Sequence, residues 1–164
     1  MFHFFKAKKV CDILSPVTGT VHPLAECKDG AFASGVLGKG VIFRYEGDCV
    51  VAPCRGKVTM VAETNHCVCL TCDNGAELLI HVGFDTVILG SKGLKVLVSK
   101  GQRVRAGQKL IEIDREFMDE RQVDLTTPMV VMNADEIDLA ILCSSGEVDA
   151  AGTVIMRCSL KAEG

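Results

Sequence analysis

The chain has 164 residues, which is enough for one domain with a single core. Apolar residues make up 48% of it and charged residues 24%, an ordinary globular composition, and the formal net charge is -3. This small negative charge argues against nucleic acid as a partner, because proteins that bind it tend to be basic. No apolar run approaches the roughly 18 residues expected of a membrane-spanning helix.

The first segment, residues 1–10, is aromatic and then basic, and we expect it to form an N-terminal arm. A signal peptide carries its charges first and a longer apolar run after them, so no export signal is predicted. The arm is expected to make at most a peripheral contact with a membrane surface, and a partly disordered terminus is the alternative. Residues 11–164 are then expected to form a single domain.

Nine cysteines would indicate disulfides in a small secreted chain. Here their number is odd, no export signal is predicted, and the chain is long enough to fold without cross-links. Reduced thiols in a cytoplasmic protein fit better. Most of these cysteines are expected to pack as small buried apolar side chains.

Short segments rich in valine, isoleucine, leucine or cysteine recur along the chain, each bounded by residues that favour turns. In chain order the predicted strands are Val10–Leu14, Thr20–Leu24, Val41–Tyr45, Lys57–Val61, Cys67–Thr71, Ala76–Val82, Val96–Val98, Lys109–Ile113, Pro128–Met132 and Val154–Arg157. Strands at this spacing, without alternating long helices, predict an all-β sandwich or barrel. One short helix is predicted over Asp114–Val123, with Asp114 as its cap and with Phe117 and Arg121 on one side.

Two segments of the chain share a pattern. Leu14-Ser-Pro-Val-Thr-Gly-Thr-Val21 and Val51-Ala-Pro-Cys-Arg-Gly-Lys-Val58 both have proline at the third position, glycine at the sixth and valine at the eighth. Proline fixes its own φ, and glycine allows a tight turn into the next strand. The repeat predicts a sheet that is built from related halves.

Two histidines flank a predicted hairpin whose turn contains Asn-Gly, a dipeptide that tolerates positive φ. If the loop is Cys72–Gly75, His66 lies directly opposite His81. If the turn is just Asn74-Gly75, His66 faces Gly83 and is a diagonal neighbour of His81. Opposite and diagonal Cβ atoms are about 5 Å and about 7–8 Å apart, so both registers bring the imidazoles within reach of each other.

The surroundings of the pair suggest phosphoryl chemistry. His81 ends an apolar run, and Gly83 is expected to leave its backbone open to a partner or to phosphate oxygens. The Thr64 hydroxyl is placed to bond a ring nitrogen of His66 and to fix its tautomer. A neutral imidazole is a competent nucleophile, and a second imidazole can stabilise phosphoryl oxygens. Spacing alone leaves two alternatives open, a purely structural pair and a zinc site.

The segment Cys69-Leu-Thr-Cys72, with Cys67 before it, has the spacing of half a zinc site, but no matching second pair follows. In a strand, Cys67 and Cys69 are expected to point to the face opposite His66. A thioredoxin-like role would need a surrounding βαβ pattern, which is missing.

Five segments of the chain together carry a family resemblance. They are Thr64-Asn-His66, Asn74-Gly-Ala-Glu-Leu-Leu-Ile-His81-Val-Gly-Phe-Asp-Thr-Val87, Lys100-Gly-Gln-Arg-Val-Arg-Ala-Gly-Gln-Lys-Leu-Ile-Glu-Ile-Asp114, Thr127-Pro-Met-Val-Val-Met-Asn133 and Ser15-Pro-Val-Thr-Gly-Thr-Val21. With these segments the sequence resembles the glucose-type enzyme IIA family of the bacterial phosphoenolpyruvate-dependent sugar phosphotransferase system. The resemblance extends roughly from Cys11 to Arg157.

This resemblance implies an antiparallel β-sandwich with one or two short helices and a histidine phosphocarrier that needs no metal or cofactor for the transfer. The histidine-containing phosphocarrier protein would phosphorylate His81, and a cysteine of a transporter's IIB domain would receive the group. His66 would stabilise the phosphoryl group, and Thr64 would orient His66. Acidic Asp29 and Asp85 would meet a basic residue of the phosphocarrier protein. Both partners would dock on an apolar rim of Phe32, Leu37 and Val87.

Three further interpretations come from other classes of protein. A biotinyl or lipoyl carrier would present a lysine at a hairpin tip, but Pro128-Met-Val-Val-Met132 contains none. A zinc hydrolase would need a third ligand, which His3 and His22 do not supply at the expected spacing. A regulatory module, in which phosphorylation of His81 switches the binding of other proteins, is compatible with phosphotransfer.

Overall fold

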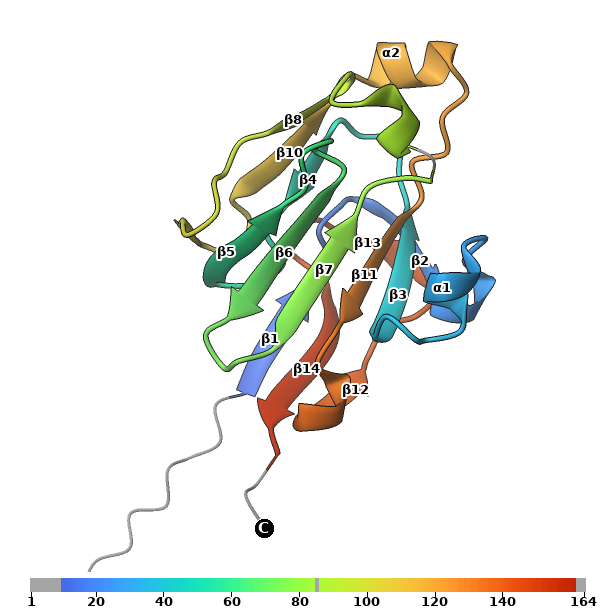
Figure 1. Cartoon of the computed structure of the whole chain (residues 1–164). Coiled ribbons are helices and arrows are strands. Elements are labelled where there is room, and N and C mark those ends of the chain that lie inside the picture. The colour runs from blue at the N-terminus through green and yellow to red at the C-terminus, as the bar shows by residue number, and fades with distance from the viewer. Residues whose placement is uncertain (1–9, 85, 162–164) are drawn as a thin grey trace, which may run out of the picture.

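The computed structural model describes residues 10–84 and 86–161. The described chain forms an antiparallel β-sandwich with fourteen strands, two short α-helices and three 3-10 turns (Figure 1). The all-β prediction is therefore confirmed. The predicted arm lies mostly outside the described residues, since β1 begins at Val10.

One large sheet of eight strands forms most of the sandwich. Its order is β13-β2-β3-β11-β7-β6-β5-β9, and each paired strand runs antiparallel to its neighbour. The strands are β13 (Gly146–Val148), β2 (Gly19–Pro23), β3 (Lys39–Arg44), β11 (Thr127–Val131), β7 (Glu77–His81), β6 (Cys67–Cys72), β5 (Gly56–Val61) and β9 (Arg103–Val104).

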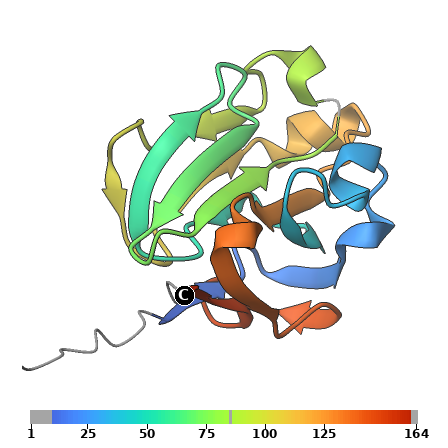
Figure 2. The same ribbon diagram turned by 60° about the horizontal axis from the view of Figure 1, so that its bottom comes forward.

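Two three-stranded sheets complete the sandwich. One has the order β1-β14-β12 and the other β4-β10-β8. Their strands are β1 (Val10–Leu14), β14 (Val154–Leu160), β12 (Ile137–Ile141), β4 (Cys49–Val51), β10 (Lys109–Ile113) and β8 (Leu94–Val96). Figure 2 shows the blue strand β1 beside the red strand β14, apart from the green strands of the large sheet.

The two segments that share the proline and glycine pattern contact each other reciprocally. The Leu14 amide donates to the Pro53 carbonyl at 2.8 Å, and the Val51 amide donates to the Pro16 carbonyl at 2.9 Å.

The main core lies between the sheets and consists of aliphatic side chains with Phe43 at its centre. A smaller apolar cluster of Cys27, Phe32, Ile42 and Val130 lies on the other face of the large sheet, with Leu79 and Phe84 packed against it. The alternation of side chains along β7 explains this division. Leu78 and Ile80 are fully buried in the main core, whereas Leu79 and His81 point to the opposite face.

Two short helices cover the ends of the sandwich. The helix α1 (Gly30–Ala33) begins at Asp29, whose carboxylate accepts a hydrogen bond from the Ala31 amide at 2.9 Å. It lies beside β3 in Figure 1. The helix α2 (Arg115–Glu120) begins at Asp114, and the Arg121 guanidinium lies 3.6 Å from the Phe117 ring centroid. Within the described ranges, neither helix has the length or apolarity to cross a bilayer.

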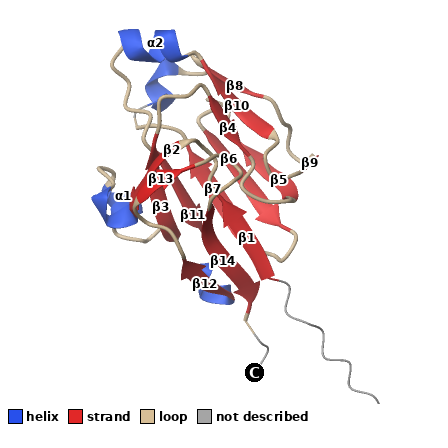
Figure 3. Cartoon of the chain, turned by 180° about the vertical axis from the view of Figure 1, so that it is seen from behind, coloured by secondary structure: helices blue, strands red, loops and turns tan. Residues whose placement is uncertain are grey.

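The predicted elements are confirmed, with boundaries that differ by at most three residues. Among the described residues, the sequence prediction missed α1 and the strands β4, β9, β12 and β13, each of which is the outermost strand at one end of its sheet; Figure 3 shows these elements from behind. Most of these elements have four residues or fewer, too short for a periodic pattern to identify them. The three 3-10 turns, Leu24–Glu26, Thr86–Leu89 and Ala134–Glu136, were also missed.

Candidate functional site

The hairpin formed by β6 and β7 has a register that neither sequence alternative predicted. Cys67 pairs with His81 and Val68 with Ile80, which places His66 opposite Val82. The connection is a three-residue loop, Asp73 to Gly75, in which Gly75 has a φ of 94°. A turn followed by a glycine with positive φ is a common three-residue hairpin loop, and its extra residue shifts the register by one.

The two imidazoles nevertheless meet. Their ring centroids are 4.8 Å apart with an interplanar angle of 78°. His66 precedes β6 and follows Asn65, whose φ of 62° turns the chain out of the extended conformation. The Asn65 amide side chain donates to the Leu94 carbonyl at 3.3 Å and holds this turn. The His66 ring is therefore free of the strict alternation that governs side chains within a strand.

Two further side chains fix the orientation of the pair. The Thr64 hydroxyl is hydrogen bonded to Nδ1 of His66, as the sequence predicts. The Phe32 ring packs edge-on against His81, with centroids 5.3 Å apart. Nδ1 of His81 is buried and has no hydrogen-bond partner among the described residues, which leaves Nε2 as the nitrogen that can react.

The protein environment favours the neutral form of both histidines. Burial lowers the pKa of His81 below its ordinary value, and the neighbouring His66 lowers it further, whereas the nearby backbone of Gly83 and the Asp29 carboxylate partly oppose the shift. Burial also lowers the pKa of His66. A neutral imidazole retains the lone pair that a nucleophile needs.

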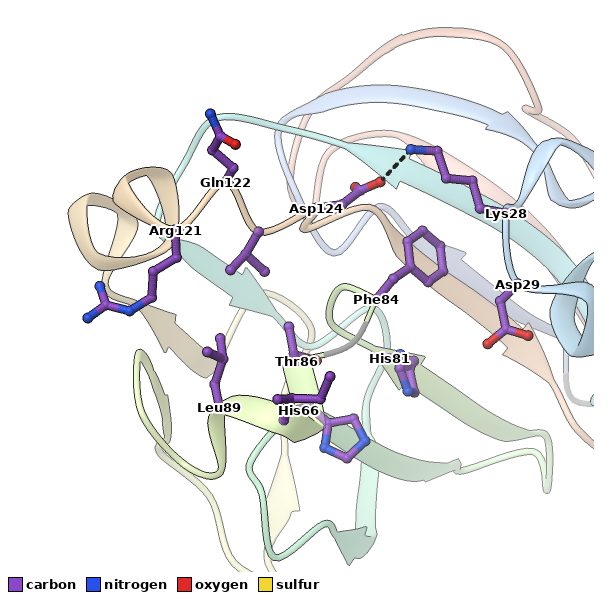
Figure 4. Close-up of a pocket in the computed structure, with 12 residues that line it drawn as sticks. Lys28, Asp29, His66, His81, Phe84, Thr86, Leu89, Arg121, Gln122 and Asp124 are labelled. Atoms are coloured by element: carbon purple, nitrogen blue, oxygen red, sulfur yellow. Dashed lines mark hydrogen bonds and ion pairs between the residues drawn. The ribbon is translucent and has the colours of Figure 1, made fainter.

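The pair lies in a pocket of about 780 Å³. Both imidazoles lie on one side of it, facing the segment that carries Gln122 and Asp124 (Figure 4). Sequence reasoning did not identify Lys28 and Asp124, which form an ion pair of 3.2 Å in the wall. These two residues are 96 positions apart, so no local pattern indicates their contact.

The Asp124 carboxylate keeps its charge in this wall. Burial alone would raise its pKa, but hydrogen bonds from the Thr126 side chain and backbone, together with Lys28, hold the pKa below its ordinary value. The carboxylate lines the same pocket that a phosphoryl group on the histidines would occupy. Its ion pair with Lys28 offsets the charge that would otherwise repel such a group.

Two sequence interpretations around the histidines are wrong. Gly83 does not present an open backbone, because it is buried and its amide donates to the Thr126 carbonyl at 3.1 Å. Cys67 and Cys69 lie on the same strand face as His81, since the observed register pairs Cys67 with His81 and Cys69 with Leu79. Both errors follow from the one-residue difference in register and from packing against the segment at Asp124.

The expected partner-binding residues are only partly gathered at the pocket. Asp29 lines it, and Phe32 packs against His81. Leu37 is 38% exposed on the turn after α1 but does not line the pocket. Asp85 lies outside the described residues, and the position of the Val87 side chain is likewise not described.

Residues 11–137 match the family described as phosphoenolpyruvate-dependent sugar phosphotransferase system, EIIA 1. The glucose permease IIA from Mycoplasma capricolum has a similar structure, with a TM-score of 0.83 and 30% sequence identity, over 94% of this chain and 99% of that one. A glucose-specific EIIA component of Borreliella burgdorferi is 31% identical over 95% of this chain and 82% of its own length.

Two longer relatives are more similar in sequence. The glucose-specific EIIBCA component of Corynebacterium glutamicum is 42% identical over 91% of this chain, and the N-acetylglucosamine-specific EIICBA component of Klebsiella pneumoniae is 40% identical over 90%. The chain spans 22% and 23% of the lengths of these relatives.

The sandwich and the matches together define a class of protein, the IIA components of sugar phosphotransferase systems. Within this class, the chain belongs to the EIIA 1 family of the phosphoenolpyruvate-dependent system.

Proposed function

We propose that this chain is a phosphoryl carrier that accepts a phosphoryl group on Nε2 of His81 and passes it on for sugar uptake. The observation that carries this proposal is the contact between two neutral imidazoles at 4.8 Å in an open pocket. Burial of Nδ1 leaves a single reactive nitrogen on His81. Family membership makes transfer of a phosphoryl group the expected chemistry.

The first step requires a donor with a labile N–P bond, and the family resemblance indicates the histidine-containing phosphocarrier protein. The lone pair of His81 Nε2 attacks phosphorus and forms a new N–P bond. The bond to the donor histidine breaks, and its electron pair returns to the donor imidazole. In the second step a cysteine thiolate of a IIB domain attacks the same phosphorus, and His81 leaves as a neutral imidazole. The bond that breaks and the bond that forms are both N–P bonds of similar energy, so the first step is reversible.

His66 is proposed to stabilise the transferred group. If the Thr64 hydroxyl donates to Nδ1 of His66, the proton of the neutral ring resides on Nε2. That N–H then donates to a phosphoryl oxygen, where negative charge is concentrated in the transition state. The buried face of the pocket, with Phe32 and Phe84, limits the access of water to the phosphohistidine.

The partners are proposed to bind around the pocket. Asp29 and Asp85 would attract a basic donor, while Phe32, Leu37 and Val87 would supply apolar contacts small enough for rapid exchange. The longer relatives are named EIIBCA and EIICBA components, which supports a IIB domain as the acceptor. Other proteins that bind only one phosphorylation state are possible regulatory targets.

We place the carrier in the cytoplasm, as a single domain over residues 11–164. None of the nine cysteines, all of which lie within the described residues, forms a disulfide, in keeping with a reducing compartment.

The decisive experiment is labelling of purified protein by phosphorylated phosphocarrier protein. His81→Gln should abolish incorporation of phosphate because the accepting nitrogen is lost. His22→Gln is the matched control, since His22 is also half-buried and hydrogen bonded to a threonine, Thr20, two residues earlier. Full labelling of the His81→Gln variant would show that another residue carries the group.

A further inference from the structure

The proposed function does not account for the unusual number of cysteines. Three of them converge although they come from distant parts of the chain, namely Cys11 on β1, Cys54 between β4 and β5, and Cys72 at the end of β6. Their sulfur atoms all lie within 4.8 Å of one another. Cys72 lies at the far end of β6 from the histidine pair. Five residues of extended chain separate the two sites, a distance of roughly 17 Å.

We propose that Cys11, Cys54 and Cys72 bind a zinc ion, with Cys158 on β14 as the fourth ligand. Zinc–thiolate bonds are about 2.3 Å long, so sulfurs bound to one ion are about 3.8 Å apart in a tetrahedron and at most about 4.6 Å apart. The observed spread of the Cys11, Cys54 and Cys72 sulfurs therefore fits a common ion after shifts of about 1 Å, whereas Cys158 lies outside this group and would have to move toward it. Each thiol that binds releases its proton to water, and no redox reaction is involved.

Two of the sulfurs are closer together than a shared zinc ion would hold them. Sγ of Cys54 and Sγ of Cys72 are 2.7 Å apart. Thiolates on one zinc lie about 3.8 Å apart, so zinc binding would separate these two sulfurs by about 1 Å. A disulfide would use only these two atoms and would leave the convergence of Cys11 unexplained, whereas a metal ion uses all three.

The groups around the Cys158 sulfur resemble those that surround a metal-bound thiolate. Its thiol donates to the Cys11 carbonyl at 3.7 Å, which places it beside the first ligand. The Asn74 amide nitrogen, which is almost fully buried, lies 3.5 Å from the Cys158 sulfur and 2.9 Å from the Cys158 carbonyl. N–H donors of this kind orient and stabilise thiolate ligands.

Burial and connectivity suggest a structural role for the ion. Cys54, Cys72 and Cys158 are each at most 2% exposed, while Cys11 is half-buried and gives the ion a route from solvent. The site would join β1, β6 and β14 and so connect a small sheet to the large one. Terminal strands are otherwise prone to local opening, and a shared ligand would oppose it.

The test begins with zinc content. Protein purified with a thiol reductant and without chelator should contain one zinc per chain by native and elemental mass spectrometry. Cys54→Ser and Cys72→Ser should reduce zinc to the background level, whereas Cys143→Ser, a free cysteine outside the cluster, should not. A double variant, His66→Gln with His81→Gln, should retain the zinc, which separates this site from binding by the histidine pair.

A second measurement needs no variant. Titration of the metal-free wild-type protein with Cd²⁺ should produce an ultraviolet thiolate-to-cadmium charge-transfer band that saturates at one ion per chain. Absence of the band would overturn the proposal even if the serine variants failed to fold. Zinc that persists in folded Cys54→Ser would also overturn it. So would a Cys54–Cys72 disulfide, recognised in peptide maps of the reductant-free protein by a linked pair lighter by two hydrogens.

Discussion

The imidazole rings of His66 and His81 lie 4.8 Å apart although the two residues are not paired across their hairpin. The register pairs His81 with Cys67, and the contact arises because the chain turns at Asn65, just before β6 begins. The site therefore depends on two local structures, the hairpin loop at Gly75 and the turn before His66. The hydrogen bond from Thr64 then sets the ring orientation.

Replacement of His66 should separate the two halves of the reaction. His66→Gln is expected to accept phosphate on His81 but to pass it to a IIB domain roughly 100-fold more slowly, because a hydrogen-bond donor to the phosphoryl oxygens is lost or misplaced. Rapid-quench measurement of both steps on the purified variant would check this. Equal rates of onward transfer in wild type and variant would exclude His66 from the step.

Removal of the Thr64 hydroxyl should act through the tautomer of His66. Thr64→Val keeps the shape of the side chain but removes the hydrogen bond to Nδ1, and a loss of about 1.4 kcal/mol would slow transfer about tenfold. Nitrogen chemical shifts of His66 should show a change in the ratio of tautomers.

The matched control for Thr64 is Thr20→Val. Thr20 bonds Nε2 of His22 at 2.8 Å in the same threonine-x-histidine arrangement, but away from the pocket. The Thr20→Val variant should change neither the rate of phosphoryl transfer nor the nitrogen chemical shifts of His66. A tautomer shift in the Thr64 variant without slower transfer would mean that orientation of His66 is unimportant.

The rate of phosphate acceptance should fall only in acid. Burial and His66 lower the pKa of His81, so the ring stays neutral until the pH falls below its ordinary value of about 6.5. In His66→Gln the second imidazole, whose protonation in acid opposes protonation of His81, is gone, and the midpoint should move upward. An NMR titration would measure the pKa of His81 in wild type and in His66→Gln. A wild-type pKa above about 6.5 would contradict the conclusion that burial and His66 lower it.

The same shift predicts the pH dependence of stability. Below about pH 6.5 the unfolded chain binds more protons at His81 than the folded chain, so the free energy of unfolding falls as the pH decreases toward the pKa of the folded state. Denaturant titrations of wild type and His81→Gln should show a smaller acid-dependent loss in the variant. An identical loss in both would mean that other groups account for it.

Substitution of Gly83 should destabilise the wall of the pocket. Gly83 has a φ of 77°, and a Cβ there would approach the Thr86 methyl to 2.7 Å and the Asp124 carbonyl to 2.8 Å. Gly83→Ala should therefore reduce the free energy of unfolding by about 2–3 kcal/mol, as measured with denaturant. Gly90→Ala is the control, with a φ of 64° but no atom within 4 Å of the added Cβ. If both variants lost the same stability, backbone strain alone would explain the effect.

The sequence by itself determined the fold class, most of the strands and the close approach of the two histidines. Apolar runs bounded by turn residues identify strands because each needs only its own residues to show the pattern. The proline and glycine repeat predicted two related segments, and the structure places these segments in reciprocal contact at Pro16 and Pro53. The helix cap at Asp114 was likewise readable, because capping is local.

Only the tertiary structure decided the hairpin register, the wall of the pocket and the cysteine cluster. A loop of three residues and one of two or four have nearly the same sequence signature, yet each shifts every cross-strand pair. Lys28 meets Asp124, and Cys11 meets Cys54 and Cys72, across long stretches of chain. Such contacts depend on how the sheets pack together, which no periodicity within one segment records.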